Sequence, residues 1–211
     1  MEQGLLREAG LGHVEEVGAL LRDNPDLNVN CRDTYGNTAL HHGSTSSRAA
    51  VVKLLLAHPD INVNALSVEN RTPLSIGCHV GWVSVVRLLL EDPRVDATLP
   101  DKRGHNPLWY AVSWGRTDVM KWLIASGRDL GEIPPQTCNV KLYGLRKDGP
   151  QGMLERFTTD QVQARREIRA SLFSGLAAGV FASINETPSR TFFLFTLQPT
   201  PNLRHSPRDC T

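Results

Sequence analysis

The stretch Arg71–Leu90, RTPLSIGCHVGWVSVVRLLL, contains two apolar segments on either side of Gly81. The first opens with Thr-Pro-Leu, a turn that leads into a short helix because proline is tolerated in the first helical turn. In the second, valine and leucine recur at intervals of three or four residues, which is typical of the buried face of a helix. The stretch therefore predicts two short helices joined by a glycine-containing turn.

The same pattern returns 34 residues away in both directions. It reads NTALHHGSTSSRAAVVKLLL over Asn37–Leu56 and HNPLWYAVSWGRTDVMKWLI over His105–Ile124. Residues 1–30 contain a weaker copy without the Thr-Pro-Leu start, as expected for a terminal repeat with one face in water. The chain is therefore predicted to be a repeat protein, in which the recurring valines and leucines form a continuous core.

A tight turn is expected before each first helix. The turns Asp33–Gly36 and Asp101–Gly104 both end in glycine, which adopts a positive φ at little cost. Asn70 holds this position in the third repeat, and asparagine is the next best residue for the left-handed conformation. Ser47 stands where Gly81 separates the helices of the third repeat, so we expect a less regular turn there.

The turns, the Thr-Pro-Leu starts and the Gly-x-x-x-Val-Val-x-Leu-Leu-Leu second helices together resemble the ankyrin repeat. The resemblance covers residues 1–130 in four repeats, of which the first is degenerate. It implies an all-α ankyrin-repeat solenoid, built from helix–turn–helix plus β-turn units of about 34 residues. It also implies that Thr38 and His41 tie successive turns together by hydrogen bonds.

The remaining residues break the repeat pattern. Residues 131–152 are rich in proline and glycine and are predicted to be a linker, followed by a C-terminal helical extension over 153–185. Within it, Thr159-Asp160 can cap a helix that reaches about Ile184. We expect Val162, Ile168 and Leu172 to cover the open end of repeat four. Residues 186–211 are expected to be a disordered tail.

The composition is that of a soluble globular protein, with 40% hydrophobic residues, 21% charged residues and a net charge of +1. This small net charge gives no global field that would favour nucleic acid or an acidic membrane. The four cysteines are widely spaced without a CxxC pair, which favours free thiols in a reducing compartment. The N-terminus has no secretory signal pattern, and the apolar run Leu172–Ile184 is too short to span a bilayer. We therefore expect a monomeric intracellular protein, cytoplasmic or nuclear, that binds neither membranes nor nucleic acid.

No pattern in the sequence predicts catalysis. The chain has no GxSxG, P-loop, HExxH or dinucleotide glycine set, and no cysteine–histidine set with zinc spacing. Cys78 and His79 could suggest a nucleophile and its base, but adjacent helical side chains point about 100° apart. We therefore expect a protein that is not an enzyme and that has no cofactor or metal.

The resemblance implies that partner proteins bind to a concave surface, here called the turn–helix face, made of the turn tips and the exposed side of each first helix. By register, the candidate partner-binding residues are Thr34, Tyr35, Asn37, Val68, Glu69, Arg71, His79, Lys102, Arg103, His105, Ser113 and Trp114. Tyrosine, tryptophan and arginine contribute disproportionately to binding energy. A basic patch of Arg71, Lys102, Arg103 and His105 could meet an acidic peptide or a phosphate.

These observations favour a non-catalytic protein–protein interaction module or scaffold, whose partner the sequence does not identify. An alternative is a substrate-docking or regulatory fragment of a larger multidomain protein that carries the catalytic part. A third hypothesis makes the C-terminal helix a lipid-surface anchor, since Arg165, Arg166 and Arg169 precede its apolar half. The lack of a basic polar face along Leu172–Ile184 argues against that hypothesis.

Overall fold

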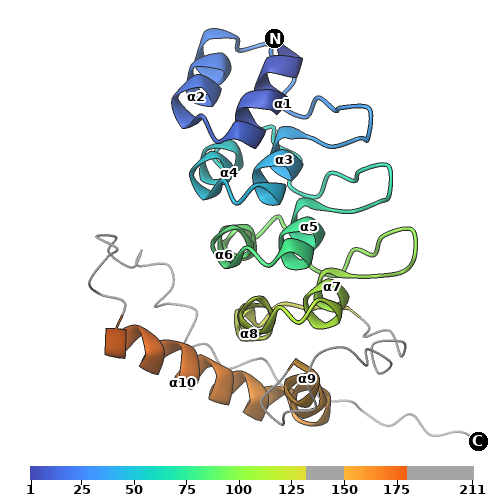
Figure 1. Ribbon diagram of the computed structural model, residues 1–211, viewed down its shortest axis with the longest axis vertical. Helices are drawn as coiled ribbons and strands as arrows, with labels where there is room; N and C mark the ends of the chain where they lie inside the picture. Colours follow the sequence, from blue (N-terminus) through green and yellow to red (C-terminus); the bar gives the residue numbers. More distant parts are fainter. Residues whose placement is uncertain (132–149, 180–211) are drawn as a thin grey trace, which may run out of the picture. The chain divides into compact units, whose positions relative to one another are not determined.

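The computed structural model of the chain describes residues 1–131 and 150–179 (Figure 1). Every regular element in this part of the chain is a helix, which confirms the all-α prediction. The chain divides into two compact units, Met1–Leu172 and Phe173–Thr211, and the following description concerns the first. Its four helix pairs are α1 (Glu2–Leu11) with α2 (Val14–Asp23), α3 (Ala39–Thr45) with α4 (Ala49–Leu56), α5 (Pro73–Val80) with α6 (Val83–Glu91), and α7 (Pro107–Ser113) with α8 (Thr117–Ser126).

The helix pairs stack in two layers (Figure 1). The first helices α1, α3, α5 and α7 pack side by side, and α2, α4, α6 and α8 form the second layer. The 34-residue period brings equivalent leucines into the core of each layer. They are Leu40, Leu74 and Leu108 in the first helices and Leu55, Leu89 and Leu123 in the second, all at most 1% exposed. Each buried leucine contributes about 1.5–3 kcal/mol, so the stack supplies the core that no single repeat could form.

The first helices begin where the sequence predicts. The Thr72 hydroxyl accepts a hydrogen bond from the Ser75 backbone N–H at 3.1 Å, and the Asn106 side chain accepts one from Trp109 N–H at 2.8 Å. In repeat two, Thr38 and His41 form a capping box. These side chains satisfy N–H groups that would otherwise lack partners at the helix start.

The predicted left-handed positions are also confirmed. Asn70 has a φ of 57°, close to the 74° of Gly36 and the 80° of Gly104 at the same position of the neighbouring turns. Ser47 has a φ of 56°, so it adopts the left-handed conformation that the glycines provide between the helices of the later repeats. The expectation of a less regular turn at Ser47 is therefore wrong, because the backbone there follows the repeat even though a glycine is missing.

The C-terminal part differs from the prediction. Helix α9 (Pro150–Thr159) lies mostly within the predicted helical extension over 153–185 but begins three residues earlier, in the expected linker, because proline is favourable at a helix start and Met153 and Phe157 both reach the core. It packs against α7 and α8. The rest of the linker, residues 132–149, and the predicted tail lie outside the described residues.

Helix α10 (Gln161–Gly179) begins at the predicted cap, since Asp160 accepts a hydrogen bond from Gln163 N–H at 2.9 Å. The expectation that Val162 packs against repeat four is wrong, because its side chain is 60% exposed. Instead Ala164 and Ile168, four residues apart, form the buried face, and Leu172 is partly buried. The predicted continuation of the helix to Ile184 lies outside the described residues.

Candidate functional site

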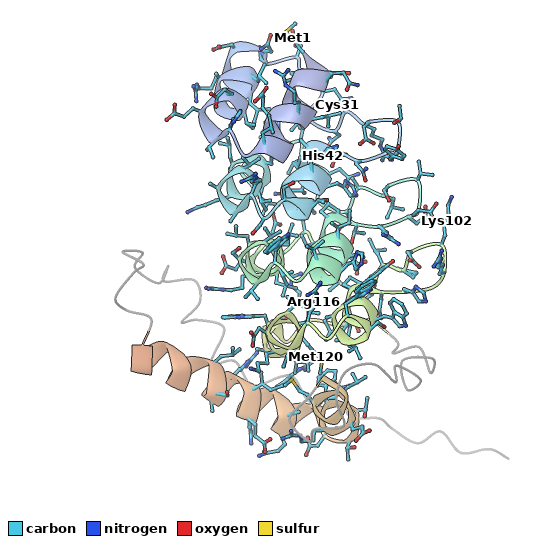
Figure 2. The ribbon with its side chains drawn as sticks, in the orientation of Figure 1. Met1, Cys31, His42, Lys102, Arg116 and Met120 are labelled. Atoms are coloured by element: carbon cyan, nitrogen blue, oxygen red, sulfur yellow. The ribbon has the colours of Figure 1, made fainter. Side chains whose placement is uncertain are left out.

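The turn tips form one edge of the turn–helix face, and they are hydrogen-bonded to one another. Val68 N–H donates to the carbonyl of Tyr35 at 2.8 Å, and Lys102 N–H donates to the carbonyl of Glu69 at 3.1 Å. A Cβ atom at Gly36 would lie 2.8 Å from the Val68 nitrogen, so only glycine allows this close approach. The tips of repeats two, three and four therefore form a continuous surface. Figure 2 labels Lys102 on the turn before α7.

An aspartate organises the turn of repeat two and another organises that of repeat four. One oxygen of Asp33 accepts backbone N–H groups from Tyr35 and Asn37, both at 2.8 Å. One oxygen of Asp101 likewise accepts those of Arg103 and His105, at 2.8 and 2.9 Å. Burial would raise the pKa of each carboxyl, but the hydrogen bonds they accept lower it, so both pKa values lie below the ordinary range. The two carboxylates are therefore committed to turn structure.

The predicted binding residues are all accessible to some degree. Tyr35 is 72% exposed, Val68 is 51% exposed and Trp114 is 47% exposed. The exposed residues are Thr34, Tyr35, Val68, Glu69, Lys102, Arg103 and Trp114, and the partly buried ones are Asn37, Arg71, His79, His105 and Ser113. Tyr35 is a large aromatic side chain that extends from a turn tip into solvent, where a partner could cover it.

In repeats three and four, four of the predicted residues gather with Tyr110, a residue that was not among those predicted. The Arg71 guanidinium carbon lies 5.3 Å from the centre of the Tyr110 ring, a cation–π distance. The His79 ring centre lies 5.4 Å from that of Tyr110 and 4.6 Å from that of Trp114. On the other side, the His105 ring centre lies 6.1 Å from that of Tyr110. We call Arg71, His79, His105, Tyr110 and Trp114 the aromatic–basic cluster.

The Tyr110 hydroxyl donates to Asp101 at 2.6 Å, which holds the ring in place. Burial and this hydrogen bond raise the pKa of Tyr110 to about 12, so the phenol stays protonated. In repeat two His42, 68 residues earlier, pairs with Asp33 at 3.0 Å in the same manner. In repeat three the turn begins with Ser67 and the equivalent position is Ile76, so both members of the pair are missing. A polar residue nine positions after the turn aspartate is thus the sequence signal that could have identified Tyr110.

Trp109, which stands where repeat two has His41, also joins the site. Its ring stacks on that of His105 with centres 3.5 Å apart and planes inclined by 5°. It packs perpendicular to Tyr110, with a centre distance of 5.3 Å. The stack holds the His105 ring against the helix of its own repeat.

The two cysteines in the described part of the chain are both buried. Cys78 is fully buried, and burial raises the pKa of its thiol, so it is not a nucleophile. Burial also raises the pKa of the Cys31 thiol. Within residues 1–131 and 150–179, no three histidine, cysteine, aspartate or glutamate side chains gather as a metal site would require. None of the described helices is long and apolar enough to cross a membrane.

Models of known protein families match these repeats. A family model described as ankyrin repeats in three copies matches residues 51–133, and a second, described as ankyrin repeats in many copies, matches residues 7–56. No curated protein matches the chain. The two models together cover residues 7–133, which is more than half of the 211 residues. Ankyrin repeats are generally protein–protein interaction modules. The chain belongs to the ankyrin-repeat family.

Proposed function

We propose that this protein is a non-catalytic interaction module that holds a partner protein on the turn–helix face, with residues 1–130 as its binding domain. The observation that carries the proposal is the aromatic–basic cluster, continued by exposed side chains on the hydrogen-bonded turn tips. Tyrosine, tryptophan and arginine concentrate binding energy when a partner excludes water from them. Tyr35 and Trp114 are exposed on this face and are therefore available to a partner.

The helical extension has a structural role in this proposal. Arg165 and Arg169 donate hydrogen bonds to the carbonyls of Arg128 and Ala125, at 3.4 and 2.9 Å. Two of the three arginines that would favour a lipid anchor are thus used to complete repeat four. We propose that residues 150–172 close the end of the stack and leave recognition to the turn–helix face. The free thiols of Cys31 and Cys78 support an intracellular setting.

A pull-down from cell lysate tests the proposal. The immobilised wild-type chain is compared with a Tyr35→Ala/Arg103→Ala/Trp114→Ala variant, which removes three exposed side chains of the turn–helix face without touching the core. Proteins that wild type retains and the variant loses, identified by mass spectrometry, are the expected result.

The matched control carries Lys53→Ala, Ser84→Ala and Asp118→Ala, three exposed positions on the second helices α4, α6 and α8. It should retain the same proteins as wild type. Both variants must melt at the wild-type temperature, which the exposure of the six side chains leads us to expect. Partners held equally by all three proteins would overturn the proposal.

A further inference from the structure

Three cations of the turn–helix face in repeats three and four, Arg71, Lys102 and Arg103, have no carboxylate partner among the described residues. The cationic residues that form ion pairs in the described part of the chain are Arg7, His13, His42, Arg94, His105 and Lys121. Arg71, Lys102 and Arg103 are not among them. On the turn tips 67–71 and 101–105, Glu69 is the only exposed carboxylate, since Asp101 is buried. The surface therefore presents more positive than negative charge, although the whole chain is almost neutral.

The environment of Arg71 makes it the centre of this charge. Its guanidinium lies over the Tyr110 ring, and its Nε, which is shielded from solvent, has no hydrogen-bond partner. Removing a cation from water without supplying an anion is unfavourable. A carboxylate that reached the other guanidinium nitrogens would bind a partly desolvated cation, where a charged hydrogen bond is stronger than in water.

The pKa of the neighbouring His79 is affected by the same positive charge. Burial lowers the pKa of His79, and the charges of Arg71 and Arg116 lower it further. The Arg116 guanidinium is held there by a hydrogen bond from its Nε to the His79 carbonyl at 3.1 Å. The cations around His79 thus come from the loop before α5 and from the loop before α8 (Figure 2 labels Arg116).

Resting on the proposed function, we infer that the partner segment is acidic: it places an aspartate or glutamate side chain on Arg71 and packs an adjacent apolar side chain against Trp114. Charge complementarity selects this occupant. Lys102 and Arg103, exposed on the turn before α7, attract the negative segment from solution. Single-stranded nucleic acid also favours arginine beside aromatic rings, but it needs a cationic groove that follows several phosphates. The cluster offers one arginine, with Arg116 beside His79 and Lys102 and Arg103 on the turn before α7, and this small group of cations fits a short carboxylate-bearing segment better.

The test is selection from a random peptide library displayed on phage, with the full chain as bait. Each peptide retained is then synthesised with a fluorescent label, and its binding is measured by fluorescence polarisation. We expect the peptides to be enriched in aspartate and glutamate over the starting library. Replacing these residues by asparagine and glutamine should weaken binding about tenfold or more, as should Arg71→Gln in the protein.

The controls separate charge from fold. Arg71→Lys should recover part of the affinity, and Lys53→Gln, which removes an exposed charge on α4, should leave it unchanged. The side chain of Arg71 can be replaced without losing the hydrogen bond that its backbone carbonyl accepts from His41.

Neutral or basic peptides, equal affinity of wild type and Arg71→Gln, or a failure to enrich any peptide would overturn the inference. So would a labelled thymidine oligonucleotide that bound as tightly as the peptides and lost its affinity in Arg71→Gln. If the pull-down in addition showed partners lost by the turn–helix variant, the proposed function would stand and only the acidic character of the partner would fail.

Discussion

His41 links the turn of repeat two to that of repeat three, and its replacement by serine has a pH-dependent cost that the structure allows us to work out. The imidazole is fully buried. Its Nδ1 accepts a hydrogen bond from Thr38 N–H at 3.1 Å, so Nε2 carries the proton and donates to the Arg71 carbonyl at 2.9 Å. Repeat three has Ser75 at this position, where its N–H still donates to Thr72. His41→Ser therefore keeps a residue type that the helix start of repeat three accepts, but it removes the hydrogen bond from Thr38 N–H and the link between repeats.

At pH 7 the substitution should lower the free energy of unfolding by roughly 2–4 kcal/mol, because a buried carbonyl loses its donor and the imidazole leaves a cavity. The difference in the free energy of unfolding between wild type and His41→Ser should become smaller in acid. Burial lowers the pKa of His41 from 6.5 to about 4, so the folded protein resists a proton that the unfolded chain accepts. Wild-type stability from this group is therefore complete above pH 6.5 and is lost as the pH falls toward about 4.

A pKa difference of about 2.5 is worth roughly 3 kcal/mol in total, of which about 2 kcal/mol is lost between pH 7 and pH 5. Urea unfolding of both proteins, followed by far-UV circular dichroism at each pH, measures the difference. Other titrating groups contribute equally to both proteins and cancel. A stability gap that stayed constant from pH 7 to pH 5 would refute the reasoning, since it would mean that His41 takes up a proton in the folded state.

Three further predictions test the packing by urea unfolding. Asn70→Ala should cost about 1 kcal/mol more than Asn70→Gly, because the backbone there is left-handed, and equal costs would contradict this. Arg128→Ala should cost roughly 2–3 kcal/mol, because its guanidinium donates to the carbonyls of Leu90, Asp92 and Val95, and a change below about 0.5 kcal/mol would show that solvent replaces those bonds. Phe157→Ala in α9 should cost about 3 kcal/mol, whereas the exposed Val162→Ala should be neutral; an unchanged Phe157→Ala would mean that the extension does not stabilise the repeats.

The repeats could be predicted in detail because their signals are local and recur. Turn residues such as Asn70 and helix caps such as Thr72 act on neighbouring backbone, so their conformation follows from residue type and position. The start of α9 at Pro150, ahead of the predicted extension, was not predicted because Pro150 indicated a loop, although proline is equally compatible with a helix start. Val162 was misplaced because the spacing of apolar residues allows more than one buried face, and tertiary packing chose the face of Ala164 and Ile168.

The candidate site was predicted less completely than the fold. Register identified Arg71, His79 and Trp114 as members of one surface, but it could not show that Arg71 and His79 both contact the ring of Tyr110. Their contacts depend on side-chain directions across neighbouring repeats. The hydrogen bond from Tyr110 to Asp101 holds one of these side chains in place, and its nine-residue spacing within repeat four is the one part of the cluster that the sequence pattern could have indicated.

The location of the partner is the central claim, and hydroxyl-radical footprinting with mass spectrometry tests it most directly. The chain is oxidised alone and with the partner recovered in the pull-down. Tyr35 and Trp114, at 72% and 47% exposure, should react in the free chain and become protected in the complex. Met1 and Val162, at 78% and 60% exposure away from the turn–helix face, should react equally in both. Protection of Val162 with undiminished oxidation of Tyr35 and Trp114 would contradict the account and move the binding surface to the helical extension.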